Sequence, residues 1–489
     1  MPSSTPALEP IRPGYRLRIL QDDQLEALRT ATLEILDSVG VHCPSARARG
    51  IYRQHGAEID EATEIVHLPP DLVLQAMAKA PRHYVLGARS PEHDAVLDGT
   101  AMYVATDGCG VETIDFDTRQ RRPSRKEDVA CMARVADALS SVGFYWPIVS
   151  AQDHPRTAPL HELDASYRNT VKHVQTETVM DERMARYAVE MARVVTGDEA
   201  TMRCRPPLSS LVCTIAPLAQ DEGGMEAALV LAEAGLPVGF MSMANTGSTG
   251  PGTLAGTLAA ADAEIVAALV LVQLAFPGAP VFHSMMPGIM HPRTGAYLAT
   301  AWEGDPFYPL GVEIAHHWGV PTLAGCFGTD ALVPGWQSAA EAPASLMLCA
   351  LCGAETGSGM GLLEACTLLY PEELILDSDI YRRVRVLAER LDVSEQSLAV
   401  DVVRQVGPRG VFLRHKHTRD SLRRLRFSDL TSQPAPAGGM QDPLQVARDK
   451  VETILRNHQP QPLEVAQKKE FERILKAADA EFASPPTRR

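Results

Sequence analysis

The feature that most constrains the fold is a regular alternation of short apolar runs with amphipathic helical patterns. A helical pattern follows each of six strand-like runs, which begin near Phe144, His173, Leu208, Pro237, Ala279 and Val320. The runs start about 29 to 42 residues apart, which is the spacing that βαβ units with parallel strands produce. Two weaker runs, near Met102 and Gly357, would complete a closed TIM (β/α)8 barrel, and this is the fold that we predict.

A doubly wound open sheet is the main alternative to the barrel. That fold commonly carries a Gly-x-Gly-x-x-Gly turn after an early strand, and the sequence has none there. We therefore place the barrel at residues 101–370, after a mixed, helical N-terminal segment at residues 1–100. The charged segment at residues 371–489 predicts C-terminal helices that pack outside the barrel. Its last six residues are expected to be disordered.

Charge and composition exclude several classes of partner. Lys and Arg number 46 against 61 Asp and Glu, and the net charge of −15 argues against nucleic acid or a membrane surface as the main partner. The N-terminus lacks the apolar segment of a secretory signal, and the longest apolar run, at residues 265–276, is too short to cross a bilayer. Nine Cys, an odd number, fit a reducing compartment. We therefore expect a cytoplasmic protein.

Two motifs that could hold a cofactor give only weak signals. The Gly-rich segment at residues 246–253 joins a strand to a long helix, but no Gly-Lys-Ser/Thr follows, so it is not a P-loop. We interpret it as a tight barrel loop that brings backbone near a ligand, with simple turn geometry as the alternative. Cys349 and Cys352 have no second Cys pair at zinc-finger spacing. We therefore expect this chain to bind no metal, flavin or corrinoid directly.

Polar residues at the strand ends mark the candidate site, because barrel enzymes bind their substrates where strands give way to helices. His173, Gln175 and Glu177 alternate along one strand and therefore share a face. Three polar side chains on one face of a central strand are unusual for packing alone. His283 lies on the fifth clear strand, and Asp330 follows the sixth. A purely structural role stays open for each of them.

Aromatic residues are scarce, and all four Trp fall within the barrel segment. Trp146 ends a strand, Phe327 belongs to the sixth run, and Trp336 lies between a strand and a helix. Several rings at one barrel mouth, beside acidic residues, would suit a quaternary ammonium through cation–π attraction. Packing in the core is the alternative for each ring.

Six segments occur in this order along the chain: ATDGCGVETIDFDTRQRRPSRKEDV, LHELDASYRNTVKHVQTETV, APLAQDEGGMEAAL, NTGSTGPGTLAGTLA, MHPRTGAY and FGTDALVPGWQSAAE. Together they resemble the trimethylamine:corrinoid methyltransferase family, and the likeness covers essentially the whole chain. The resemblance implies a TIM barrel that moves a methyl group from a methylated amine to the Co(I) of a separate corrinoid protein.

One position departs from the archaeal trimethylamine enzymes of this family. Those enzymes carry pyrrolysine in the stretch that matches GTDALVPGWQ, and the matching position here is Leu332. A Leu can neither form an adduct with an amine nor orient it. The chain is therefore similar to the larger non-pyrrolysine branch, whose known activities are on quaternary amines such as glycine betaine. This departure argues against trimethylamine itself as the substrate.

The expected chemistry asks little of the protein beyond orientation and charge. A quaternary ammonium is an activated leaving group that needs no proton, so the barrel must desolvate it, orient it and balance its charge. The predicted catalytic set is Glu177, Asp330 and His173, with the two carboxylates balancing the cation. The predicted substrate contacts are polar groups, aromatic walls and the position matched to pyrrolysine: Trp146, Gln175, His283, Phe327, Leu332 and Trp336.

Two other functions stay open from the sequence. One is a zinc-dependent barrel methyltransferase that uses His283 or His173 with a Cys, for which the ligands would have to cluster in space. The other is a non-catalytic barrel that binds a betaine-like ligand. The sequence does not determine the exact substrate, the corrinoid partner or the oligomeric state, and a homo-oligomer is compatible with it.

Overall fold

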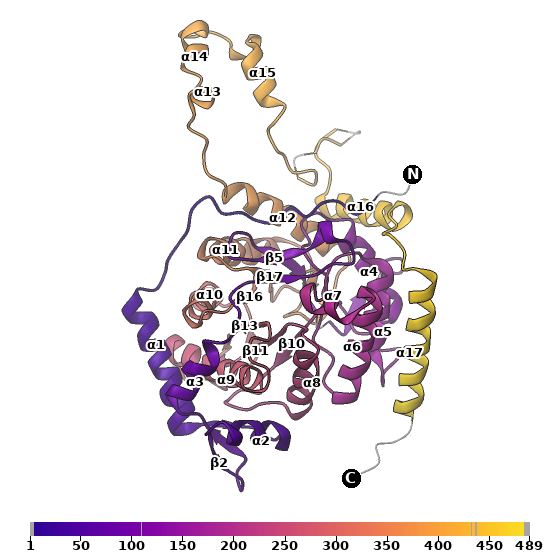
Figure 1. Ribbon diagram of the computed structural model, residues 1–489. Helices are drawn as coiled ribbons and strands as arrows, with labels where there is room; N and C mark the ends of the chain where they lie inside the picture. The colour runs from indigo at the N-terminus through magenta and orange to yellow at the C-terminus, as the bar shows by residue number, and fades with distance from the viewer. Residues whose placement is uncertain (1–3, 109, 432, 436–437, 484–489) are drawn as a thin grey trace.

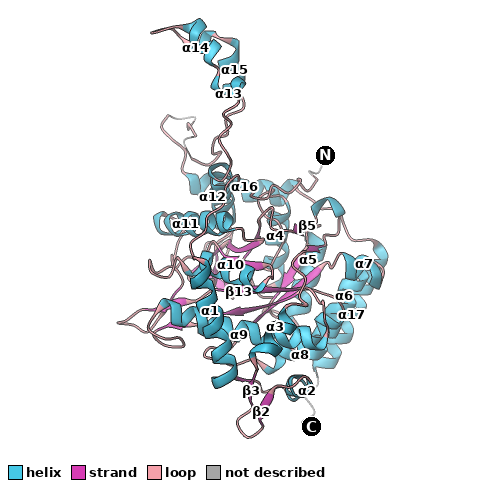
Figure 2. Ribbon diagram, turned by 60° about the vertical axis from the view of Figure 1, so that its left-hand side comes forward, coloured by secondary structure: helices cyan, strands magenta, loops and turns pink. Residues whose placement is uncertain are grey.

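The structure, a computed structural model, describes residues 4–108, 110–431, 433–435 and 438–483. Residues 484–489, for which we expected disorder, lie outside this part of the chain. Seven parallel strands form a curled sheet in the order β6-β17-β16-β13-β11-β10-β9. The two edges of this sheet meet through residues 144–145, because Phe144 pairs with Ala105 of β6 and Tyr145 pairs with Val174 of β9. The barrel is therefore closed, as predicted, with its helices around the strands (Figure 2).

Each strand is followed by a helix on the outside of the barrel. The units are β6 (Tyr103–Thr106) with α4 (Lys126–Asp137), residues 144–145 with α5 (Ala158–Asn169), β9 (Val174–Thr176) with α6 (Glu182–Thr196), β10 (Leu208–Cys213) with α8 (Glu222–Glu233), β11 (Val238–Ser242) with α9 (Leu254–Ala275), β13 (Val281–Met285) with α10 (Phe307–Trp318), β16 (Thr322–Gly325) with α11 (Trp336–Cys352), and β17 (Thr356–Met360) with α12 (Glu373–Leu387). A short helix, α7 (Glu199–Cys204), precedes β10. The six clear runs and the two weak ones thus all contribute to the barrel wall.

Small strands shape the loops at the carboxyl ends of the barrel strands. They are β7 (Glu112–Ile114), β8 (Arg121–Pro123), β12 (Asn245–Thr246), β14 (Gly288–Met290), β15 (Tyr297–Leu298), β18 (Leu362–Leu363) and β19 (Leu368–Leu369). These strands form two small sheets, β12-β14-β15 and β18-β19-β7-β8. Loops from different parts of the chain are therefore joined to one another at this end of the barrel.

The barrel interior is filled with apolar side chains, because alternate residues of each strand point inward. The interior cluster includes Phe144, Trp146, Leu211, Phe282 and Leu323. Residues of the hairpin β4 (Tyr84–Leu86) and β5 (Ala95–Leu97) belong to the same cluster, with the short helix η2 (Pro91–His93) between the two strands. This hairpin closes the N-terminal end of the barrel, so the opposite end carries the mouth.

The N-terminal segment covers the outer face of α9. It contains α1 (Asp22–Glu34), η1 (Ile35–Val39), β1 (Val41–His42), α2 (Ala46–Gln54), β2 (Glu58–Asp60), β3 (Ile65–His67) and α3 (Pro70–Met77), and its three α-helices pack on α9. The Tyr52 hydroxyl donates to the Ala267 carbonyl of α9 at 2.8 Å. A helix that is covered on every side is expected to be apolar all round. Among the described residues, α9 is the one helix long and apolar enough to cross a membrane, but 89% of its most apolar stretch is buried inside the protein.

The C-terminal segment divides into two parts. α12, α16 (Pro443–Asn457) and α17 (Val465–Ala483) pack on the helices of the barrel, and α17 runs along α6 (Figure 1). Residues 389–429, which we call the arm, project away from the body with α13 (Glu395–Leu398), α14 (Val400–Val406), η3 (Phe412–Arg414) and α15 (Lys416–Leu422). The prediction that all C-terminal helices pack on the barrel is therefore wrong for the arm.

Candidate active site

Buried carboxylates hold the loops of the barrel mouth in place. Glu162 on α5 accepts hydrogen bonds from the Ser150 hydroxyl at 2.8 Å, the Ala151 N–H at 3.1 Å and the Thr178 hydroxyl at 2.6 Å. These bonds join the loop after residues 144–145 to the loop after β9. Burial raises the pKa of Glu162, and the three donors act against that rise. The two loops are thus held to a common scaffold helix.

Glu264 on α9 holds the next two loops in the same way. It accepts hydrogen bonds from the Thr214 hydroxyl at 2.6 Å, the Ser242 hydroxyl at 2.8 Å and the Leu218 N–H at 2.9 Å. Burial raises the pKa of Glu264 as well. Because a helix is more rigid than a loop, such contacts fix the geometry of the mouth before a ligand arrives.

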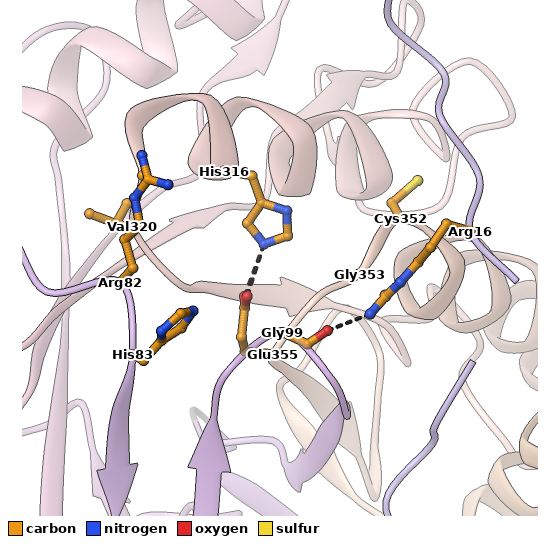
Figure 3. A pocket seen from close by; sticks show the side chains of 10 residues that line it. Arg16, Arg82, His83, Gly99, His316, Val320, Cys352, Gly353 and Glu355 are labelled. Atoms are coloured by element: carbon orange, nitrogen blue, oxygen red, sulfur yellow. Dashed lines mark hydrogen bonds and ion pairs between the residues drawn. The ribbon is translucent and has the colours of Figure 1, made fainter. Parts of the chain in front are cut away.

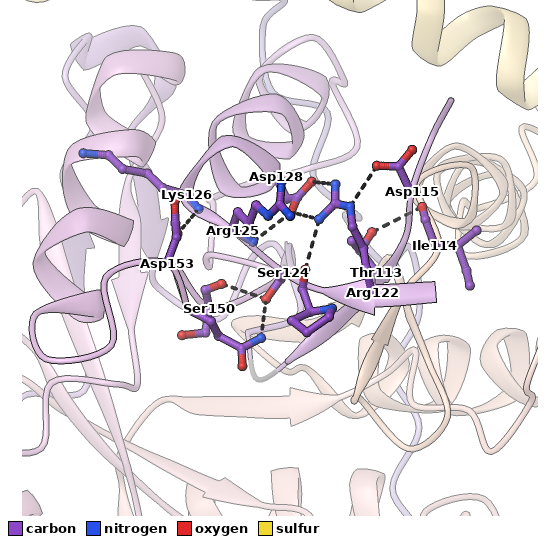
Figure 4. Close-up of polar contacts among 12 residues, drawn as sticks. Thr113, Ile114, Asp115, Arg122, Ser124, Arg125, Lys126, Asp128, Ser150 and Asp153 are labelled. Carbon is purple, nitrogen blue, oxygen red and sulfur yellow. Dashed lines mark hydrogen bonds and ion pairs between the residues drawn. The ribbon is translucent and has the colours of Figure 1, made fainter. Parts of the chain in front are cut away.

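A charged hairpin, β7–β8, lies beside the mouth (Figure 4). Arg122 forms ion pairs with Asp115 at 2.8 Å and with both carboxylate oxygens of Asp128 at 2.8 Å each. The Ser124 hydroxyl donates to the Ser150 carbonyl at 2.7 Å. The charged residues of this motif therefore have architectural roles: they hold the hairpin against α4 and the neighbouring loop.

Glu177 lies just beyond β9 on the inward-facing side of that strand. Its Oε1 accepts a hydrogen bond from the Cys213 thiol at 3.0 Å, while its Oε2 is buried without a hydrogen-bond partner among the described residues. Burial raises the pKa of Glu177 to about 7; the Cys213 thiol opposes this rise, and the nearby Asp107 and Glu162 carboxyls add to it. Glu177 is therefore balanced between its neutral and charged forms near neutral pH.

Gln175 and His173 lie progressively deeper on the same strand face. Gln175 is 2% exposed; its Oε1 lies 3.4 Å from the Ser209 hydroxyl, and its Nε2 has no hydrogen-bond partner in the described part of the chain. His173 Nδ1 lies 3.0 Å from the Gly87 carbonyl, and burial lowers the pKa of His173 to about 4. The neutral ring therefore donates from Nδ1 to backbone at the closed end of the barrel. Gln175 and Glu177 are brought together near the mouth, whereas His173 has a supporting position below them.

Asp107, which follows β6 directly, is a site residue that was not predicted from the sequence. This carboxyl is 5% exposed, accepts the Gly108 N–H at 2.9 Å and is hydrogen-bonded to Cys366. Burial raises the pKa of Asp107. Its place at a strand end was a sequence signal that could have found it, and the same is true of Cys213, the last residue of β10. Asp107 and Glu177 thus place two buried acids at the mouth.

Trp146 provides an apolar wall beside these acids. Its indole lies directly on the backbone of Gly108, since a Cβ at that glycine would be 1.7 Å from the indole Nε1. The Thr106 hydroxyl donates to the Trp146 carbonyl at 2.6 Å, and the Trp146 N–H donates to Thr106 Oγ1 at 2.9 Å. Because Gly108 adjoins Asp107, the ring and the carboxyl belong to one small region.

His283 lies on the opposite side of its strand from the one we expected. It is fully buried, and its Nε2 lies 2.9 Å from Asp262 Oδ1 on α9. Its neighbour Phe282 belongs to the barrel interior, and side chains alternate between the two faces of a strand. His283 therefore faces the helical layer and is not part of the mouth.

Asp330 holds two loops together. Its Oδ1 accepts the Ala299 N–H at 3.2 Å, and its Oδ2 accepts the N–H and the hydroxyl of Thr300 at 3.1 and 2.7 Å. Glu341 on α11 in turn accepts the Asp330 N–H at 3.2 Å. The carboxylate that we expected to balance a cation is thus already engaged with the loop after β13.

Three further predicted residues lie away from the two acids or on the surface. Phe327 is 1% exposed and packs in the core against Gly359, where a Cβ would lie 2.9 Å from the Phe327 Cβ. Leu332, on the loop that leads into α11, is 64% exposed, and Trp336, the first residue of α11, is 86% exposed. Together with the exposed Trp302 and Val333 they form what we call the rim patch: Trp302, Leu332, Val333 and Trp336.

A cavity of about 330 Å³ lies at the other end of the barrel (Figure 3). Arg16, Arg82, His83, His316 and Glu355 are among the residues that line it. The His316 Nε2 lies 3.0 and 3.1 Å from the two Glu355 carboxylate oxygens. Since TIM-barrel enzymes bind substrate at the carboxyl ends of their strands, this cavity is not the candidate site.

The fold and the mouth define a class: a (β/α)8-barrel enzyme whose site offers buried acids, a thiol and an indole. In the described part of the chain, no group of three or more His, Cys, Asp or Glu side chains is placed to hold a metal ion. Residues 3–483 match the family described as trimethylamine methyltransferase (MTTB), so the chain belongs to this family and is a methyltransferase.

Three known proteins illustrate the relationship. Trimethylamine methyltransferase MttB of Desulfitobacterium hafniense (strain DSM 10664 / DCB-2) is 32% identical over 459 residues, which are 92% of each chain. The glycine betaine methyltransferase of Desulfitobacterium hafniense (strain Y51) is 28% identical over 446 residues, 91% of each chain. The crystal structure of the Methanosarcina barkeri monomethylamine methyltransferase (MtmB) matches with a TM-score of 0.48 and 12% identity, over 94% of this chain and 92% of that one.

Proposed function

We propose that this chain moves a methyl group from a methylated ammonium compound to the Co(I) of a corrinoid that a separate protein carries. The family supports methyl transfer, and relatives named for trimethylamine and for glycine betaine support a methylated amine as the donor. The observation that carries the proposal is the buried Oε2 of Glu177, which has no hydrogen-bond partner among the described residues and lies close to a second buried acid.

A cation at the mouth would relieve the electrostatic conflict between these acids. Two carboxyls in a desolvated region favour the protonated state of one another. A methylated ammonium supplies positive charge at that place, so Glu177 can ionise without the cost of an uncompensated buried charge. The Trp146 ring would add about 0.5–2 kcal/mol if the cation lies against its face.

The proposed donor is a quaternary amine of the betaine type. Leu332, which matches the pyrrolysine position, is exposed and has no group that could capture a tertiary amine. Charge must then select the substrate, and a permanent cation keeps its charge at every pH. The Nε2 of Gln175, which has no hydrogen-bond partner within the described ranges, is a donor one strand repeat below Glu177, and it suits the carboxylate of a betaine.

The residues of this chain orient the substrate and adjust to the loss of its charge. When the partner is docked, its corrinoid supplies the nucleophile for the methyl group. The electron pair of the N–C bond stays on nitrogen, so the product is a neutral tertiary amine and no side chain has to donate a proton. Once the positive charge is gone, Glu177 can take up a proton from solvent, and the product loses its counter-charge.

The rim patch is the proposed docking surface for the corrinoid protein. Exposed Trp side chains are uncommon on the surface of a protein that has no partner there, and Trp302 and Trp336 are 90% and 86% exposed. Asp330 joins the loops that carry them. The partner would thus meet an apolar surface at the same end of the barrel as the two acids.

The test is methyl transfer by the purified chain to free, chemically reduced cobalamin, followed by absorbance. Glycine betaine and tetramethylammonium are expected to be methyl donors, with little transfer from trimethylamine. Glu177→Gln should lower the turnover about tenfold or more, because it removes the carboxylate that would balance the charge of the cation. Glu58→Gln, at an exposed carboxyl of β2, is the matched control and should behave as the wild type.

Each contrary result would refute a different part of the proposed function. Trimethylamine as the preferred donor would refute the quaternary-amine preference. Binding of these compounds without methyl transfer, to free cobalamin or to any corrinoid protein, would support the non-catalytic barrel instead. Stoichiometric zinc in an active preparation would support the zinc-dependent alternative.

A further inference from the structure

The arm, residues 389–429, has no core of its own. It leaves the body after α12 and returns before α16, and none of its residues is buried (Figure 1). Its helices have between three and seven residues. Helices shorter than about 12 residues are marginal in water unless tertiary packing stabilises them. The arm therefore requires a surface that covers it.

Large apolar side chains are exposed on both limbs of the arm. They include Leu391, Val400, Phe412, Leu413, Leu425 and Phe427. Leu391 and Phe427, at the two ends of the arm, are 85% and 80% exposed. Several large apolar side chains exposed on one segment are typical of an interaction site.

Ion pairs and a hydrogen bond hold the base of the arm in place. Arg426 and Glu389 pair across the two limbs at 2.7 Å. The Ser428 hydroxyl donates to Asp379 on α12 at 2.8 Å, and Asp429 pairs with Arg382 of α12 at 2.6 Å. These contacts determine where both limbs leave the body. The direction in which the arm projects is therefore held by specific interactions at its base.

The charge of the arm is opposite to that of the rest of the chain. Residues 389–429 contain nine Lys and Arg and six Asp and Glu, a net charge of +3, so the remaining residues carry −18 of the chain's total of −15. Two arms would repel each other, whereas an arm and the body of another copy would attract each other. The charge pattern thus favours contact between the arm and a body.

We propose that the arm docks onto the body of a second copy of this chain and makes the protein a homo-oligomer. A reciprocal exchange of arms would bury both apolar surfaces in one closed, symmetric assembly. α12 ends at Leu387, whose carbonyl accepts the Tyr15 hydroxyl at 3.1 Å, next to the Arg16 cavity at the N-terminal end of the barrel. The arm therefore begins at the end of the barrel opposite the mouth, and docking of the arm leaves the mouth accessible. This inference is independent of the reaction proposed above.

The test is sedimentation of the full chain over a range of concentrations and salt. The wild type is expected at a multiple of the 53.0 kDa chain mass, with weaker association at high salt because the contact is partly ionic. The double variant Leu425→Asp/Phe427→Asp should raise the dissociation constant of self-association at least about tenfold. Arg423→Glu/Arg424→Glu should do the same and should remove most of the salt dependence.

Matched controls separate the arm from general surface effects. Val465→Asp and Arg186→Glu change an exposed apolar residue and an exposed Arg of the body, and both should leave the association unchanged. Thermal unfolding checks that each variant is folded.

Three results would overturn the inference. The wild type could sediment as a monomer at tens of micromolar, or the arm variants could associate as the wild type does. The third contrary result is a monomeric protein whose arm binds nucleic acid or anionic vesicles. Hydrogen exchange of the arm amides should fall with rising protein concentration, and protection that is independent of concentration would also contradict it.

Discussion

The affinity of the site for a permanent cation should fall as the pH is lowered through the pKa of Glu177. Burial raises that pKa from 4.5 to about 7. A bound cation favours the ionised carboxylate and returns the pKa toward its ordinary value. Binding must therefore expel a proton from Glu177 at acid pH, whereas at alkaline pH the proton is already absent.

The expected change in the dissociation constant follows from the pKa shift of Glu177. A change from about 7 to about 4.5 corresponds to about 3.4 kcal/mol at about 1.36 kcal/mol per pH unit. The dissociation constant should be constant above about pH 8, should rise about tenfold per unit below about pH 7, and should level off near about pH 4.5.

Calorimetric titration with tetramethylammonium at constant ionic strength measures this directly, because the ligand itself does not titrate. Glu177→Gln should bind more weakly at high pH and should lose the pH dependence. Asp107→Asn should move the midpoint to lower pH, since Asp107 is one of the groups that raise the pKa of Glu177. Asp330→Asn, the control, should keep the wild-type pH dependence, because its carboxylate is engaged with the loop at Thr300. A wild-type affinity that is flat between about pH 6 and pH 8, or a slope that persists in Glu177→Gln, would refute the reasoning.

Three other predictions follow from the packing and the rim. Gly108→Ala places a Cβ 1.7 Å from the Trp146 indole and should lower the free energy of unfolding, measured by denaturant titration, by about 1–3 kcal/mol. An unchanged free energy of unfolding would mean that the indole ring can move. Lys172→Met removes a buried amino group that donates to three backbone carbonyls of residues 136, 139 and 142 at the end of α4, and should lower that free energy by about 1–3 kcal/mol, with unchanged stability as the contrary outcome. Trp302→Ser/Trp336→Ser should slow methyl transfer to the corrinoid protein but not to free cobalamin, and equal slowing of both would exclude a docking role.

Parts of the site could be predicted from strand periodicity, and parts could not. Gln175 and Glu177 share a face because side chains alternate along β9, and the structure places both near the mouth. The β13 run around His283 is buried on both faces, as strands of a parallel barrel are, so the sequence contains no alternating pattern that tells inward from outward residues. The positions of Asp330, Leu332 and Trp336, at and before the start of α11, depend on contacts with distant segments, such as that between Asp330 and Thr300, which local sequence does not encode.

The sequence by itself determined the barrel, because eight apolar runs separated by helical patterns have few ways to bury their surfaces other than a closed parallel sheet. It also determined which strand carries the acid and amide of the candidate site. Only the tertiary structure decided the protonation of Glu177, since the pKa depends on how much water and how many other carboxyls surround the group. The same holds for the arm: residues 389–429 have the composition of ordinary surface helices, and only the placement of their anchors on α12 shows that they leave the body and expose an apolar, basic surface.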